Sequence, residues 1–296
     1  MEPHRAPQHE LDALDEGRAF VDLSAYRKVR VTGTDARAWL GDLITSDVAS
    51  LEPGASQRSL LLTPTGQIRA DLAVAMDREG FLLLQAPDQP DPVIGLLARY
   101  VLSSDVTLED VGTALSLFAV PGEGLVDPAR ATALTPSVLG WGVDLVVAAG
   151  PPSRELKEAL GARGLVEAGP DAAESWRIRR GVARMGPDFG QDALPAEAGL
   201  DWAIDATKGC FLGQESVARV RNLGHPPTVL RRVRGAGGVE AGSPVRAGDS
   251  PVGTITSAAL APDGGIVAII RVRWAAQSGP WVTEGGETLD PTGPTD

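Results

Sequence analysis

Residues 208–215 read Lys-Gly-Cys-Phe-Leu-Gly-Gln-Glu, and they are the stretch that decides how the rest of this chain is interpreted. The stretch contains the only cysteine of the 296 residues, and a glycine lies on each side of it. Glycine is suited to sharp turns and to backbone that a ligand approaches closely. Since almost no aliphatic bulk accompanies these polar and reactive groups, we predict a surface loop that contacts a ligand or partner.

The stock of cysteine and histidine limits the chemistry. One cysteine excludes an internal disulfide, and it also excludes an iron–sulfur or structural zinc site built by this chain alone, because such sites need about four ligands. The three histidines are His4, His9 and His225, too few for a histidine-rich metal site or a convincing Ser-His-Asp triad. We therefore predict no resident metal. Cys210 is expected to be a partly exposed thiol that acts as a nucleophile or transient ligand, and the alternative is a small buried residue.

The charge of the chain is unevenly distributed. The net charge is −12, yet residues 176–234 carry ten basic and six acidic side chains. A positive window in an acidic protein favours an anionic ligand there, although a solvated face with scattered ion pairs has the same pattern. No direct binding of nucleic acid is expected, since the chain as a whole is acidic.

The first two thirds of the chain alternate between strand and helix patterns. The turn Thr63-Pro64-Thr65-Gly66 has proline second and glycine fourth, which suits a type I turn and predicts a hairpin. The predicted strands are residues 28–32, 58–62, 68–76, 80–85, 106–111, 114–120 and 143–148. The predicted helices are residues 36–44, 91–102, 153–163 and 172–180, while 215–221 opens either a helix or a strand. This order indicates an α+β region with an antiparallel sheet.

The pattern changes after Pro226-Pro227. Residues 228–274 contain short β runs separated by glycine-rich turns, which predicts a small C-terminal β-barrel. The predicted domains are a disordered tail over 1–16, an α+β region of two lobes over 17–227, a barrel over 228–282 and a disordered tail over 283–296. The sequence contains neither a membrane span nor an apolar signal-peptide centre, so a cytoplasmic protein without membrane contact is expected.

Residues 208–215 resemble the motif K-G-C-[YF]-x-G-Q-E of the YgfZ-type folate-binding proteins. These proteins are relatives of the glycine-cleavage-system T-protein, an aminomethyltransferase. The octapeptide is a specific signal, and weaker matches occur in the family's order over roughly residues 21–274. Those matches are Arg30-Val31-Thr32-Gly33 with Asp35 and Trp39-Leu40, Leu60-Leu61-Leu62, Pro64-Thr65-Gly66, Asp71-Leu72, Arg177-Ile178, Leu194-Pro195 with Glu197, and Val252-Gly253 with Thr256-Ser257.

The resemblance implies a three-lobed α+β fold with tetrahydrofolate in a central hole. It implies Cys210 and Lys208 as the catalytic pair, with Lys208 as anion partner or thiolate stabiliser. The implied folate-binding residues are Asp71, Arg177, Gln214, Glu215 and Arg219. For each of these residues an ordinary structural role is the alternative: an ion pair for Arg177, capping for Glu215 and a solvated charge for Arg219.

Two positions depart from the family pattern. T-proteins carry two adjacent aspartates after the first hairpin turn, whereas Ala70-Asp71 supplies one carboxylate here. Where the family commonly has a glutamate that grips the pterin, this chain has Arg179, and a guanidinium contains only donors. Both departures argue against the usual pterin pose and against aminomethyl transfer.

Three functions follow from the resemblance and its departures. The first is a folate-binding, monomeric accessory protein that supports iron–sulfur cluster assembly or repair through partner or client proteins, and thereby tRNA modification. The second is a tetrahydrofolate-dependent aminomethyltransferase, the activity to expect if the chain is an enzyme. The third is a non-catalytic module that binds another anion.

Overall fold

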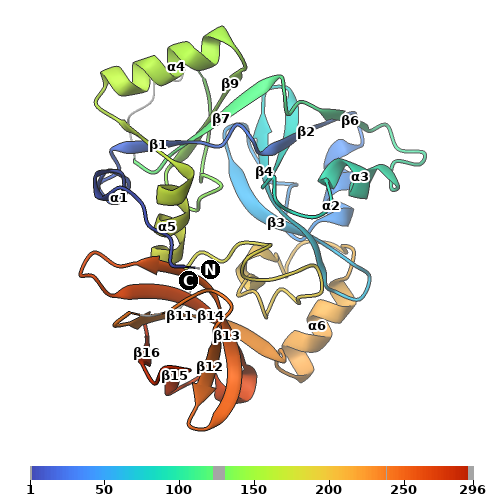
Figure 1. Ribbon diagram of the computed structural model, residues 1–296. Helices are drawn as coiled ribbons and strands as arrows, with labels where there is room; N and C mark the ends of the chain where they lie inside the picture. The colour runs from blue at the N-terminus through green and yellow to red at the C-terminus, as the bar shows by residue number, and fades with distance from the viewer. Residues whose placement is uncertain (1, 123–130, 238, 293–296) are drawn as a thin grey trace. The chain divides into compact units, whose positions relative to one another are not determined.

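The computed structural model describes residues 2–122, 131–237 and 239–292 (Figure 1). The chain divides into two compact units that interleave in sequence. The sheet unit consists of Asp12–Gly169 and Ala203–Gln214, and the barrel unit consists of Met1–Leu11, Pro170–Trp202 and Glu215–Asp296. The octapeptide is thus in the sheet unit except for its last residue, Glu215.

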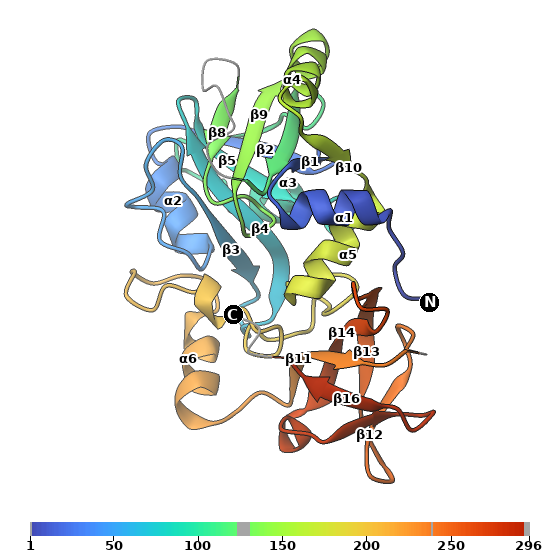
Figure 2. The ribbon, with the colours of Figure 1, turned by 90° about the vertical axis from the view of Figure 1, so that its left-hand side faces the viewer.

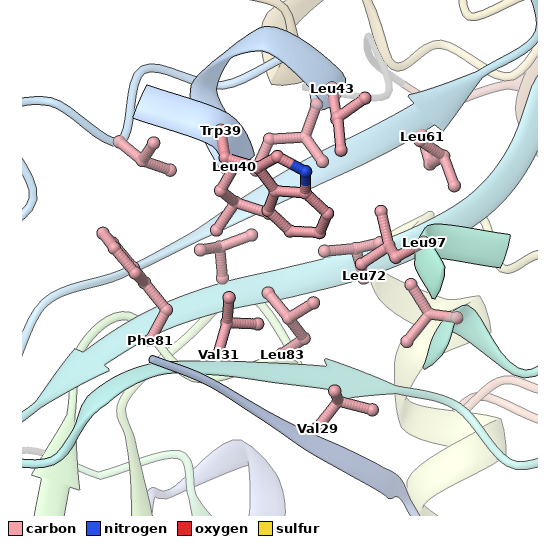
Figure 3. Close-up of a cluster of buried hydrophobic side chains, with 14 of the residues drawn as sticks. Val29, Val31, Trp39, Leu40, Leu43, Leu61, Leu72, Phe81, Leu83 and Leu97 are labelled. Atoms are coloured by element: carbon pink, nitrogen blue, oxygen red, sulfur yellow. The ribbon is translucent and has the colours of Figure 1, made fainter. Parts of the chain in front are cut away.

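The first sheet of the sheet unit is entirely antiparallel, in the order β3-β4-β5-β2-β6. Its strands are β2 (Arg27–Thr32), β3 (Ser56–Leu62), β4 (Ile68–Asp77), β5 (Gly80–Gln85) and β6 (Thr107–Asp110). Alternate residues of these strands point to one face, where the helices α2 (Ala36–Leu43) and α3 (Val93–Ala98) supply the facing side chains. Figure 3 shows Trp39 and Leu40 of α2 above Val31, Leu72 and Leu83 of the sheet, all of them buried.

The second sheet has the order β10-β1-β7-β9-β8. It contains β1 (Ala19–Asp22), β7 (Leu115–Val120), β8 (Thr132–Leu134), β9 (Val143–Ala148) and β10 (Val166–Ala168). Pairing is antiparallel except between β1 and β10, which run parallel. The helix α4 (Pro151–Ala162) packs along β9 (Figure 2) and buries Leu156 and Leu160. The other face of the first sheet packs on this second sheet, where Ala73 and Leu84 share a core with Leu117 and Val146.

The barrel unit is built on a closed six-stranded barrel in the order β11-β14-β13-β12-β15-β16. The strands are β11 (Thr228–Gly235), β12 (Pro244–Ala247), β13 (Ser250–Leu260), β14 (Ile266–Arg273), β15 (Trp281–Thr283) and β16 (Thr288–Pro291). Val233, Ile255, Ile270 and Trp281 are fully buried in its interior. The helix α5 (Pro170–Arg180) packs against β13 and β14, and α6 (Gln214–Leu223) precedes the barrel. The predicted class, α+β with antiparallel sheets and a C-terminal barrel, is confirmed.

The structure differs from the sequence analysis at both ends of the chain. Residues 8–15 form the helix α1 (Gln8–Asp15), in which Leu11 and Leu14 are buried, where a disordered tail was expected. The strand β16 lies in the other expected tail, and its Leu289 fills the barrel core with Trp281, so the barrel extends beyond residue 282. Residues 1 and 293–296 lie outside the described residues. None of the described helices is both long enough and apolar enough to span a bilayer.

Candidate functional site

The octapeptide loop is fixed to the end of α2 by backbone hydrogen bonds. The N–H of Leu212 donates to the carbonyl of Asp42 at 3.0 Å, and the N–H of Asp205 donates to the carbonyl of Thr45 at 3.0 Å. The hydroxyl of Thr45 donates to the carbonyl of Ala203 at 2.7 Å. The loop is therefore held at three points along residues 203–212.

Lys208 is part of this attachment. Its Nζ donates to the carbonyls of Gly41 and Ile44 at 2.6 Å each and to that of Ser46 at 3.0 Å. The last carbonyls of a helix have no partner within the helix, so a lysine is well placed to satisfy them. An ammonium has three N–H groups, and all three are used. In the structure Lys208 anchors the loop, and its role as an anion partner or thiolate stabiliser stays a prediction.

Burial is the main influence on the Lys208 ammonium. It lowers the pKa of this group below the ordinary lysine value, and three neighbouring carboxylates partly offset the effect. Those carboxylates are Asp47, Asp205 and Asp42.

The two glycines of the loop, Gly213 and Gly209, differ in how closely other atoms surround them. Gly213 has a φ of +87°, and a Cβ at this position would lie 2.5 Å from the carbonyl oxygen of Thr63 in the β3–β4 turn. Only glycine fits this close approach without strain. A Cβ on Gly209 would meet no atom within 4 Å, so the space beside Cys210 is open on that side. The packing of the loop thus requires Gly213, whereas Gly209 borders open space beside the exposed thiol.

Cys210 is exposed, while the next residue, Phe211, is buried. The thiol accordingly lies on a loop whose neighbours on both sides are fixed. Among the described residues, no group of three or more His, Cys, Asp or Glu side chains could hold a metal ion.

Asp71 lies on β4, and its carboxylate is paired with Arg58 of β3. Arg58 donates Nε to Oδ1 at 2.8 Å and Nη2 to Oδ2 at 2.5 Å, a two-pronged pair that fixes the carboxylate. Gln89 holds the backbone of the same residue, accepting from its N–H at 3.0 Å and donating to its carbonyl at 2.5 Å. Asp71 is only 8% exposed, so this pair lies in an environment of low dielectric constant.

Arg58 and Gln89 were missed by the sequence analysis. The predicted hairpin contained the signal for Arg58. Leu60 faces Asp71 across the strands, so Arg58 is two residues away on the same face, within reach of a long side chain. Gln89 lies in a loop after β5, where no sequence pattern points to it.

Arg177 of α5 is buried, and all five of its N–H groups are used. Nε and Nη2 donate to the Glu174 carboxylate at 2.7 and 2.5 Å, and Nη2 also reaches the Ser257 hydroxyl at 3.1 Å. Nη1 donates to Asp188 at 2.7 Å and to the carbonyl of Val182 at 2.8 Å. A guanidinium has no further donors. In the structure Arg177 ties α5 to β13 within the barrel unit, which is the ion-pair role given as the alternative to a folate contact.

The remaining predicted residues lie on α6. Gln214 is half-buried at the start of the helix, where its N–H donates to the carbonyl of Phe211 at 3.2 Å. Glu215 is in the first turn, where a carboxylate interacts favourably with the helix dipole. Glu215 and Arg219 are both exposed. These three side chains can reach a ligand, and Arg179 lies half-buried in the last turn of α5.

Comparison with known proteins finds sequence similarity to several aminomethyltransferases. Residues 2–124 match the GCVT N-terminal domain family. The chain is 27% identical over 241 residues to an aminomethyltransferase of Chlorobium phaeobacteroides, covering 70% of this chain and 66% of that protein. It is also 27% identical over 274 residues to a putative chloroplastic transferase of Arabidopsis thaliana, covering 83% of this chain and 63% of that protein. The chain therefore spans just under two thirds of the length of these relatives.

A solved structure shows the same fold. The crystal structure of the glycine cleavage system aminomethyltransferase T from Bartonella henselae superposes with a TM-score of 0.81, covering 99% of this chain and 90% of that chain at 21% identity. The resemblance to the T-protein is thus confirmed at the level of the fold. The narrower resemblance to the YgfZ type stays a prediction.

Proposed function

We propose that this chain is a tetrahydrofolate-binding accessory protein that supports iron–sulfur cluster assembly or repair, and thereby tRNA modification, with Cys210 as its working group. The observation that carries the proposal is the placement of the thiol. Lys208, Gly213 and several backbone hydrogen bonds fix the loop, while the sulfur atom of Cys210 is exposed. A cysteine kept only for packing would be buried.

Three observations support folate as the cofactor. The relatives are named aminomethyltransferases, and the fold is that of aminomethyltransferase T. The Asp71 carboxylate uses one lone pair of each oxygen on Arg58, so acceptor capacity is left for N–H groups of a pterin. Gln214, Glu215 and Arg219 are open to a ligand, with Arg219 suited to a carboxylate of the folate tail.

The residues of the loop divide the work. Lys208 and Gly213 hold the backbone against α2 and the β3–β4 turn, and Cys210 presents the sulfur. A single thiol cannot hold a cluster, so the reaction would use ligands of a partner or client protein or an exchange of redox state with it. We also propose that the protein acts as a cytoplasmic monomer.

A second function, tetrahydrofolate-dependent aminomethyl transfer, is supported by the names of the relatives. The Arg58–Asp71 pair argues against it in this chain. Both oxygens of the Asp71 carboxylate already accept hydrogen bonds from the Arg58 guanidinium, and the neighbouring Ala70 supplies no second carboxylate. Turnover of an aminomethyl donor with tetrahydrofolate would decide in favour of this second function.

The test uses cells that lack this protein, and it measures the activity of an iron–sulfur enzyme in those cells. Cys210→Ala and Cys210→Ser are expected to fold as the unaltered protein does but to leave the enzyme activity unrestored, while the exposed control Ala218→Ser restores it. Full restoration by Cys210→Ala would remove the thiol from the function.

Calorimetric titration with tetrahydrofolate tests the cofactor separately. The unaltered chain is expected to bind, and Arg179→Glu is expected to bind more tightly by supplying a second acceptor for the pterin. A chain that binds folate-free polyanions but not tetrahydrofolate would instead be a general anion-binding module.

A further inference from the structure

The barrel unit contains a cavity of about 300 Å³ that is lined by none of the residues described in the candidate functional site. Its walls come from three segments: residues 194–201, the last two turns of α6 with the following Gly224-His225-Pro226, and Trp274 at the end of β14. Most of the lining is hydrocarbon from Leu194, Pro195, Val217 and Val220. The volume is at the lower end of the range for small-molecule sites, so the cavity suits a small metabolite.

The helix above the cavity lacks packing on its apolar face. Val217, Val220, Arg221 and Gly224 are spaced by three and four residues, so they lie on one face of α6, and that face lines the cavity. No side chain of residues 214–222 is buried. A helix ordinarily buries an apolar stripe against a core. Here the stripe faces a hollow, and a bound apolar group would complete it.

Two opposite charges meet in the same cavity. Arg221 is the cation and Asp201 the anion, and both line the walls. They form no direct ion pair with each other or with another residue of the described chain. A ligand that is only a carboxylate would be attracted by Arg221 and repelled by Asp201, and an amine would meet the reverse. A ligand with both charges satisfies both side chains.

Burial and the charge of Arg221 act in opposite directions on the pKa of the Asp201 carboxylate. Burial raises the pKa of Asp201 above the usual aspartate value, and Arg221 partly offsets this shift. A cation that arrived beside Asp201 would remove the penalty and favour the ionised form.

The aromatic wall is preformed. The rings of His225 and Trp274 are stacked with centroids 5.0 Å apart and an angle of 2° between their planes. The Nδ1 of His225 lies 3.1 Å from the carbonyl oxygen of Pro226, which fixes the imidazole. The stack supplies a flat, firm surface for hydrocarbon.

From this juxtaposition we propose that the cavity binds a zwitterionic α-amino acid with an apolar side chain. Arg221 takes the carboxylate, Asp201 takes the ammonium, and the side chain fills the space between Val217, Val220 and Trp274. The site is independent of the function proposed above, and it uses none of the residues of the octapeptide loop.

The test is calorimetric titration of the full chain with four probes. L-Leucine has both charges and a side chain, 4-methylpentanoate lacks the ammonium, 3-methylbutylamine lacks the carboxylate, and glycine lacks the side chain. Each of the last three is expected to bind at least about tenfold more weakly than leucine, because each loses one charge-assisted contact or the buried hydrocarbon. Leucine affinity should also fall as the pH drops through the raised pKa of Asp201, since the carboxylate becomes neutral.

Variants on the two polar groups locate the site. Arg221→Leu and Asp201→Asn are each expected to lose about tenfold in leucine affinity. Arg219→Leu, on the same helix but away from the cavity lining, is the matched control and should bind unchanged. Leucine should also slow amide hydrogen exchange in α6, which lies over the filled cavity.

Two results would overturn the proposal. One is equal binding of all four probes, or no binding of leucine at all. The other is an equal loss from Arg219→Leu and Arg221→Leu, which would indicate attraction by the general charge of the helix. Neither result depends on tetrahydrofolate or on Cys210, so the function proposed above stands or falls separately.

Discussion

Replacing Asp144 by asparagine should stabilise this protein at neutral and alkaline pH. Asp144 is fully buried on β9, where its carboxylate accepts the Ser137 hydroxyl at 2.5 Å and the N–H of Val138 at 2.8 Å. Burial raises its pKa from 3.8 to about 7, and these two hydrogen bonds oppose the shift. An asparagine keeps the shape. Its oxygen can accept from Val138, and its amide can donate to the Ser137 oxygen, since a hydroxyl also accepts.

The magnitude follows from linkage between protonation and folding. The folded chain holds the proton up to about pH 7, whereas the unfolded chain releases it near 3.8. The stability that this proton contributes is therefore complete at low pH and is lost as the pH rises from 3.8 to about 7. Each pH unit is worth about 1.4 kcal/mol, so the whole loss is about 4 kcal/mol, of which about 2 falls between pH 5.5 and 7. That is a large share of the roughly 5–15 kcal/mol that stabilises a typical domain.

Urea unfolding at about pH 5.5, 7 and 8.5 measures this difference. We expect Asp144→Asn to exceed the unaltered chain by about 2–4 kcal/mol at pH 8.5 and to converge with it at lower pH. The control is Asp249→Asn, at an exposed position, which should follow the unaltered chain at every pH. Parallel pH profiles for Asp144→Asn and the unaltered chain, or a less stable variant at pH 8.5, would refute the reasoning.

The remaining predictions concern the loop and α5. Gly213→Ala should destabilise the fold by about 1–3 kcal/mol in thermal unfolding, because the residue has a positive φ and a Cβ would lie 2.5 Å from a backbone oxygen. The control Gly209→Ala should change the free energy of unfolding by less than about 0.5 kcal/mol. Lys208→Met should cost about 1–3 kcal/mol, because it leaves three backbone carbonyls without this donor, two at the end of α2 and that of Ser46 just beyond it. Faster hydrogen exchange around the loop is the readout. Arg177→Met should cost about 3–5 kcal/mol in urea unfolding by leaving the buried Asp188 carboxylate uncompensated, and an unchanged midpoint would contradict the network described here.

Local patterns predicted most of the sheet unit. The turn at 63–66 forms, with Gly66 at a φ of +84°, and the strands on both sides of it are β3 and β4. The alternating residues 28–32 lie in β2, the strand predicted over residues 80–85 is β5, and the helix expected over 36–44 is α2. These elements have strong local signals: proline and glycine in a turn, period-two alternation, and apolar residues three and four apart.

The misses arose where distant parts of the chain decide the outcome. The helix α1 has a polar composition, and only Leu11 and Leu14 with their neighbour Ala13 are buried, so composition concealed it. The strand β16 is short and acidic, and Leu289 is its one buried residue. The helix expected over 91–102 is reduced to α3. Pro92 is its N-cap, and after Ala98 the α-helical bonds give way to three-residue turns, in which the N–H groups of Tyr100 and Val101 donate to the carbonyls of Leu97 and Ala98.

The sequence identified residues of the candidate site, but it did not show which partners their charged side chains contact. Cys210 is exposed as expected, because the glycines around it are visible in the sequence. Lys208, Asp71 and Arg177 all have partners that a sequence does not display: helix-end carbonyls, Arg58, and the pair Glu174 and Asp188. A charged residue can be recognised in a motif, but which counter-charge it meets depends on tertiary packing.

The interleaving of the two units also bears on how the protein emerges from the ribosome. Residues 12–169 of the sheet unit are synthesised early, but this unit lacks its last piece, residues 203–214, until residues 170–202 of the other unit have been synthesised. The segment with Cys210 is therefore synthesised after the end of α2 and the β3–β4 turn, the parts of the sheet unit that it contacts. A shortened chain that stops before residue 203 would leave the carbonyls at the end of α2 without the Lys208 donor. The thiol of Cys210 can reach its place on the sheet unit only after residues 170–202 of the barrel unit have been synthesised.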